Sequence, residues 1–139
     1  MLNQTQTFKE LLANNGYSLT RQRQIIFNYL LTKNQIETKQ LIEDLTSLID
    51  KASIYRNIKL FAGLGIILRI SNGFKSKLEL SDIFTTHHHH LTCAKCGNVV
   101  NINPERLEKF LQTIAKENNF YPSSHQIEVQ GLCAKCKTF

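Results

Sequence analysis

The sequence lacks the features that would place the chain in a membrane, outside the cell or among the zinc hydrolases. No apolar run approaches the roughly 20 residues of a membrane-spanning helix, and the polar start at residues 1–5 does not resemble a secretory signal peptide. The four cysteines all fall into two Cys-x-x-Cys pairs, a pattern typical of reduced, metal-binding thiols. The His-Glu-x-x-His motif of zinc hydrolases is absent. We therefore expect a cytoplasmic protein that is not an enzyme.

The two cysteine pairs, residues 93–96 and 133–136, are separated by 36 residues. Zinc binds four thiolates from paired loops, and its binding energy becomes folding energy for a small domain. A disulfide framework is disfavoured without a secretory signal, and a redox-active Cys-x-x-Cys does not need two copies. The pairs predict a structural Zn²⁺ site with the ligands Cys93, Cys96, Cys133 and Cys136.

Four consecutive histidines, residues 87–90, directly precede the first cysteine pair. They cannot all be packed as satisfied core residues, and histidine is the commonest metal ligand. If this run is a strand, successive side chains point to opposite faces. The tetrad then separates His87 and His89 from His88 and His90. We expect at least one further divalent metal ion here.

The positive charge is concentrated in the N-terminal half. The formal net charge is +6, and residues 1–80 hold 11 Lys or Arg against six Asp or Glu. A local basic excess of this kind is typical of a nucleic-acid-binding surface, although many basic surfaces are merely solvated.

Three helices are predicted before residue 50. The first covers residues 8–13 and ends in the turn at residues 14–16, and the second covers residues 21–31 with Thr20 as its cap. Thr38 is expected to cap the third. Its predicted buried stripe is Leu41, Ile42, Leu45, Leu48 and Ile49.

A fourth helix begins at Asp50 or Ser53 and ends near residue 62. At about 100° per residue, one side carries Ile54, Ile58 and Phe61, and the opposite side carries Ala52, Tyr55, Arg56 and Lys59. Arginine suits guanine and lysine suits phosphate, so this helix has the composition of a major-groove recognition helix. The alternative is an ordinary amphipathic helix with a solvated face.

Two apolar runs, residues 66–71 and 74–80, flank Asn72-Gly73, the strongest short signal for a β-hairpin. Helices followed by a hairpin predict a winged helix, whose wing carries Arg69, Lys75 and Lys77. We therefore expect an α+β protein with a winged-helix DNA-binding domain at residues 1–80, a hinge at 81–86 and a small zinc-stapled α/β domain at 87–139.

The small domain is predicted to contain a strand at residues 99–102 and a helix that Asn103 caps. The apolar stripe of this helix is Leu107, Phe110, Leu111 and Ile114. Glu108 lies at the edge of the buried side. Residues 125–130 alternate as a strand with His125 on the apolar face, and an exposed sheet edge offers a surface for dimerisation.

Over nearly its whole length the chain resembles the ferric-uptake-regulator (Fur) family of metal-responsive bacterial repressors, with its zinc-sensing branch as one possibility. The resemblance rests on residues 19–23, residues 52–57, the histidine tetrad with Cys93-x-x-Cys96-Gly97, and His125 with Gly131-x-Cys133-x-x-Cys136. It implies a homodimer that binds a double-stranded DNA operator when a regulatory metal closes the hinge.

The resemblance also implies roles for individual residues. The four cysteines match the structural zinc site, and a second metal site matches His87, His89, Glu108 and His125. The hinge-side regulatory site matches His88 and His90 with a carboxylate, either Glu79 or Asp82. The DNA-binding residues expected are Ser53, Tyr55, Arg56, Lys59, Arg21, Arg23, Lys75 and Lys77.

Three positions depart from the family pattern. Gln35 replaces a histidine ligand of the DNA-binding domain, Asn101 replaces an acid after the first cysteine pair, and Ser18 replaces a minor-groove lysine. A regulatory site with few ligands suits four-coordinate Zn²⁺ better than Fe²⁺ or Mn²⁺. We expect a repressor of metal-uptake or metal- and peroxide-stress genes. A zinc-storing or structural protein without DNA binding is the alternative, and a zinc hydrolase is the least favoured class.

Overall fold

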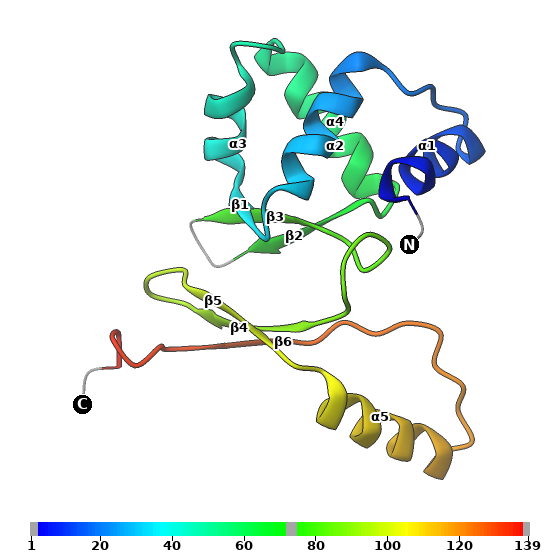
Figure 1. Ribbon diagram of the computed structural model, residues 1–139. Coiled ribbons are helices and arrows are strands. Elements are labelled where there is room, and N and C mark those ends of the chain that lie inside the picture. Colours follow the sequence, from blue (N-terminus) through cyan, green and yellow to red (C-terminus); the bar gives the residue numbers. More distant parts are fainter. Residues whose placement is uncertain (1–2, 72–74, 138–139) are drawn as a thin grey trace. The chain divides into compact units, whose positions relative to one another are not determined.

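The computed structural model describes residues 3–71 and 75–137 (Figure 1). The chain forms two compact units, Met1–Thr85 and Thr86–Phe139. Phe84, in the segment predicted as a hinge, belongs to the core of the first unit, where its ring lies 5.0 Å from that of Phe27. None of the described helices is long and apolar enough to cross a membrane.

The first unit is the predicted winged helix. Its elements are α1 (Gln4–Asn14), α2 (Arg21–Leu31), β1 (Ile36–Glu37), α3 (Thr38–Leu45), α4 (Lys51–Gly63), β2 (Ile67–Ser71) and β3 (Ser76–Leu80). The strands form an antiparallel sheet in the order β1-β3-β2, beside the helices (Figure 1). The predicted Asn72-Gly73 turn lies outside the described residues.

Side-chain caps fix where two of these helices begin. Thr20 Oγ1 accepts the N–H of Arg23 at 3.3 Å, so α2 has the predicted bounds. Asp50, one of the two residues predicted to start α4, accepts the N–H of Ser53 at 3.0 Å. The core includes Phe8 stacked on Phe27, with ring centroids 4.0 Å apart.

The structure corrects four details of this unit, the first being that α1 begins at Gln4, four residues before its predicted start. Thr38 is the first residue of α3 and not its cap, because Glu37 takes that position and the Thr38 hydroxyl donates to the Ser76 carbonyl oxygen at 3.3 Å. Leu48 is 62% exposed, since α3 ends at Leu45 before the predicted stripe does. The sheet also contains β1, which was not predicted.

The second unit contains β4 (His89–Cys93), β5 (Val99–Ile102), α5 (Glu105–Glu117) and β6 (Glu128–Gly131). The sheet order is β5-β4-β6, with β4 antiparallel to β5 and parallel to β6. The last predicted strand therefore begins three residues late, and His125 lies in the segment before it. Pro104, predicted as the first helical residue, takes the N-cap position of α5 in place of Asn103, although Asn103 accepts the N–H of Glu105 at 3.0 Å.

The apolar stripe of α5 is not buried within the single chain. This helix lies wholly within the described residues and buries none of its side chains, and Phe110 is 62% exposed. One sheet face is open as well, because the cross-strand neighbours Leu91, Val100 and Val129 are all exposed. The second unit thus presents uncovered apolar surface.

Candidate metal centres and nucleic-acid interface

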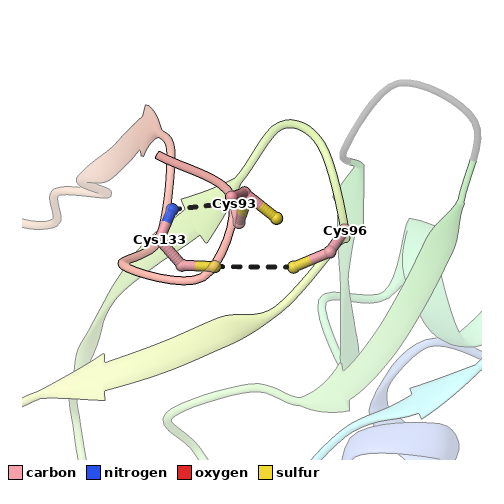
Figure 2. Close-up of side chains that lie close together, drawn as sticks. Cys93, Cys96 and Cys133 are labelled. Atoms are coloured by element: carbon pink, nitrogen blue, oxygen red, sulfur yellow. Dashed lines mark hydrogen bonds between the residues drawn. The ribbon is translucent and has the colours of Figure 1, made fainter. Parts of the chain in front are cut away.

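The four cysteines form a compact cluster. Cys93 ends β4, Cys96 lies in the following turn, and Cys133 and Cys136 follow β6. Their four Sγ atoms lie within 4.8 Å of one another, and Cys96 Sγ is 3.7 Å from Cys133 Sγ (Figure 2). A tetrahedron with Zn–S bonds of 2.3 Å has edges of about 3.8 Å, so the cluster fits a zinc ion.

Backbone geometry brings the two cysteine pairs together. Parallel pairing of β4 with β6 sets Cys93 opposite Gly131, and the Ala94 N–H donates to the Gly131 carbonyl oxygen at 2.8 Å. Gly97 closes the first turn with a φ of 76°, a left-handed conformation that glycine adopts without steric cost. The tight turn explains why a glycine directly follows Cys96.

The backbone also prepares the sulfur atoms for a cation. Hydrogen bonds from the backbone N–H groups of Cys96 and Cys133 lower the pKa of the Cys93 thiol to about 6. Figure 2 shows the bond from Cys133, which is 3.4 Å long. The adjacent thiol of Cys96 is the largest cause that raises the pKa of Cys136 to about 12. A metal ion that binds the cluster would displace the remaining thiol protons.

A second cluster gathers three imidazoles around one carboxylate oxygen. Glu108 Oε1 lies 3.1 Å from His87 Nε2, 2.9 Å from His89 Nε2 and 2.6 Å from His125 Nε2. The four possible ligand atoms all lie within 4.8 Å of one another. Although His125 lies outside the predicted strand, the structure brings together all four residues predicted for this site.

Charge at this cluster favours an ionised carboxylate. Burial acts to raise the pKa of Glu108, but hydrogen bonds from the three histidines outweigh it and hold the pKa below its ordinary value. An ionised carboxylate only accepts hydrogen bonds, so an imidazole that bonds to Glu108 donates from Nε2, whereas the 3.1 Å contact between the Nε2 atoms of His87 and His125 needs one of them unprotonated. A metal ion that binds at Nε2 would require the ring proton of a neutral imidazole to sit on Nδ1.

The other two histidines lie together on the opposite side, as strand alternation predicts. The ring centroids of His88 and His90 are 4.7 Å apart. His88 Nδ1 lies 2.7 Å from the Thr86 carbonyl oxygen, which can only accept. Nδ1 therefore carries the proton, and Nε2 is the nitrogen suited to a metal ion.

The two carboxylates predicted for the regulatory site belong to the first unit. Glu79 lies on β3, is 3% exposed and accepts a hydrogen bond from Gln35 Nε2 at 3.3 Å. Asp82 lies in the turn after β3 and is exposed. The carboxylate of Glu79 is thus buried in the first unit, whereas that of Asp82 lies at the surface.

Helix α4 presents the predicted polar face. Tyr55, Arg56 and Lys59 are exposed, whereas the apolar residues opposite them are buried. Ser53 is only 5% exposed: its hydroxyl donates to Asp50 Oδ1 at 2.7 Å and accepts from Arg56 Nη2 at 3.0 Å. Ser53, which the exposed Asp50 holds in place, thus orients the Arg56 guanidinium.

The other predicted DNA-binding cations differ in their partners. Arg21 is exposed. Arg23 donates to Asn57 Oδ1 at 3.2 Å and to the Ser18 carbonyl oxygen at 2.6 Å, so it ties α2 to α4. Lys75 forms an ion pair with Glu37 at 3.2 Å, and Lys77 is half-buried on β3.

Sequence reasoning missed two basic residues near this helix. A hollow of about 620 Å³ is lined in part by Tyr55, Lys75, Lys39 and Lys51. Lys39 and Lys51 lie in the first turns of α3 and α4, and this clustering at neighbouring helix starts could have identified them. Glu37 and Glu43 also line the hollow and pair with Lys75 and Lys39, so its net positive charge is small.

Comparison with known proteins agrees with this arrangement. The model of the Ferric uptake regulator family matches residues 14–130. The peroxide-responsive repressor PerR of Staphylococcus saprophyticus subsp. saprophyticus is 31% identical over 130 residues, which cover 91% of this chain and 86% of that protein. Peroxide and iron regulators both occur among the relatives, so the zinc-sensing branch is not singled out.

Solved structures share the fold. The Vibrio cholerae ferric uptake regulator is 30% identical, with a TM-score of 0.69 and coverage of 90% of this chain and 98% of that chain. The Helicobacter pylori regulator Fur is 16% identical, with a TM-score of 0.78 and coverage of 96% and 91%. The chain therefore belongs to the ferric uptake regulator family of metal-responsive, DNA-binding transcription regulators, and it is not an enzyme.

Proposed function

We propose that this protein is a transcriptional repressor whose operator affinity is gated by a divalent metal ion bound to His88, His90 and a carboxylate of the first unit. The division of the histidine tetrad into two ligand faces carries this proposal. One face belongs to a cluster that is complete within the second unit. The other face, His88 and His90, begins three residues after the first unit ends. A metal ion bound there that also recruits Glu79 or Asp82 would tie the two units together.

The remaining metal sites have a supporting role. The cysteine cluster would hold structural Zn²⁺, and the His87, His89, Glu108 and His125 cluster would take a second ion that orders the second unit. Zn²⁺ is also favoured at the regulatory site because it tolerates few ligands, with Fe²⁺ or Mn²⁺ as alternatives. When bound, each ion would hold its ligand side chains together by coordinating them.

We infer a homodimer, and the apolar surface of the second unit supports it. Phe110 and Ile114 on α5 are exposed, as are Leu91, Val100 and Val129 on one sheet face. Soluble monomers rarely leave contiguous apolar patches of this kind uncovered. A second copy of the chain would bury them and present two recognition helices to one operator.

The relatives suggest which genes are controlled. The S. saprophyticus relative is named a peroxide-responsive repressor. We infer repression of metal-uptake or metal- and peroxide-stress genes, in the cytoplasm where bacterial DNA lies. A zinc-storing protein without DNA binding is less consistent with the exposed Tyr55, Arg56 and Lys59 of α4. A gel shift with and without a chelator separates these functions, because a zinc-storing protein without DNA binding gives no shifted band in either condition.

Replacing Arg56 by alanine should relax base preference at the operator. The free energy of binding to the operator should become less favourable by roughly 1–3 kcal/mol, because Arg56 would bind the edge of a guanine. Binding to random DNA should change little. Binding to both DNAs is measured by fluorescence anisotropy, with Arg106→Ala on α5 as the control. Unchanged selectivity in the Arg56 variant would exclude base recognition by this residue.

Replacing Lys77 by alanine should weaken binding to all DNA sequences to the same extent. A lysine that contacts phosphate adds affinity through counterion release, so the salt-dependence slope should fall by about 1. The slope is obtained from binding isotherms at several salt concentrations, with Lys116→Ala as the control. A sequence-dependent loss would instead assign Lys77 to base contacts.

A further inference from the structure

Gln35 lies beside Glu79 because of strand pairing. Ile36 of β1 pairs with Leu78 of antiparallel β3, so the residue before Ile36 lies opposite the residue after Leu78. The Gln35 Nε2 atom donates to Glu79 Oε2 at 3.3 Å. Both residues belong to the first unit, so this contact is formed by one unit alone.

The chemistry of the pair fixes which way the amide points. An ionised carboxylate only accepts hydrogen bonds, whereas a glutamine amide has a donor end and an acceptor end. The NH₂ group must therefore face Glu79, and the amide oxygen turns away from it.

We propose that Gln35 is a positioning residue of the regulatory metal site, which it serves by orienting the Glu79 carboxylate while staying out of the coordination shell. This inference rests on the proposed function and selects Glu79 over Asp82 as the ligand. Partners that orient metal-bound carboxylates reduce the cost of ordering the ligand when the ion binds. The amide nitrogen that faces the carboxylate is no metal ligand, so the site keeps two imidazoles and one carboxylate.

Two consequences follow for metal affinity. Loss of the Gln35 amide should weaken metal binding by roughly 10–100-fold, the usual effect of removing a hydrogen-bond partner of a ligand. An imidazole at this position would add a nitrogen ligand, so Gln35→His should bind metal more tightly than the natural chain. Gln35 thus sets the metal concentration at which the regulator responds.

The test is a Zn²⁺ titration of operator binding by the full-length protein with its cysteine-bound zinc in place. For Gln35→Leu, the metal concentration at half-maximal binding should rise 10–100-fold, and for Gln35→His it should fall. Gln6→Leu is the matched control, because Gln6 Nε2 donates to the Glu10 carboxylate at 2.8 Å on α1. A Gln35→Leu midpoint equal to that of Gln6→Leu overturns the inference, including when the melting temperature falls.

The titration also distinguishes this inference from the proposed function. If His88→Ala/His90→Ala responds to metal as the natural protein does, the regulatory site itself is wrong and the role of Gln35 falls with it. If that double variant loses its response while Gln35→Leu behaves as the control, only the role of Gln35 is wrong. If Asp82→Ala abolishes the response and Glu79→Ala does not, Gln35 orients a carboxylate that is no ligand, and the inference is overturned.

Discussion

Replacing Cys93 or Cys133 by serine is expected to unfold the second unit and leave the chain monomeric. A four-thiolate zinc site contributes on the order of 10 kcal/mol to a small fold, as much as the whole stability of many domains. The second unit depends on it because α5 buries none of its side chains within the chain. Sedimentation and hydrogen exchange should report a monomer in which the first unit stays protected and the second does not.

Serine substitutions at the residues directly after Cys93 and Cys133 provide the matched controls. Ala94→Ser and Ala134→Ser place the same hydroxyl in the same turns without removing a ligand, and both should remain folded dimers. Dimers that survive both the cysteine changes and removal of the bound zinc would contradict a structural role for the cluster.

The double change His88→Ala/His90→Ala should leave a folded dimer whose operator affinity no longer responds to metal. Allosteric coupling of this kind is typically worth about 1–3 kcal/mol, so a 5–150-fold gain in affinity would be lost. The companion change His87→Ala/His89→Ala removes two ligands of the cluster within the second unit. It should mainly lower the stability of that unit, because it removes two metal ligands and the buried side chain of His89.

These two variants are compared by operator binding during metal titration and by thermal unfolding. A full metal response in the His88/His90 variant, together with its loss in the His87/His89 variant, would exchange the roles of the two histidine faces.

Features set by local chemistry could be predicted from the sequence. The Thr20 cap gave the bounds of α2, and the helical period of α4 separated the exposed Arg56 from the buried Ile58. Strand alternation likewise separated His88 and His90 from their neighbours. In each case the signal lies within a few residues of the feature that it determines.

Features set by distant partners could not be predicted. Two-residue β1 exists because Ile36 pairs with Leu78, some 40 positions away, and β6 begins at Glu128 because it pairs with β4. Ser53 is buried and bonds to Asp50 and Arg56, although the family resemblance implies a DNA contact for it. The apolar stripe of α5 predicted a buried face, but the single chain does not cover that face.

Metal gating is tested most directly by the operator affinity of the natural protein, with zinc bound to its cysteines, before and after addition of the regulatory metal. We expect the operator affinity to rise 5–150-fold when metal is added. It should fall back to its starting value when a chelator removes that ion alone. The same affinity with and without the added ion, in a folded dimer whose cysteine-bound zinc is intact, would contradict metal-gated repression.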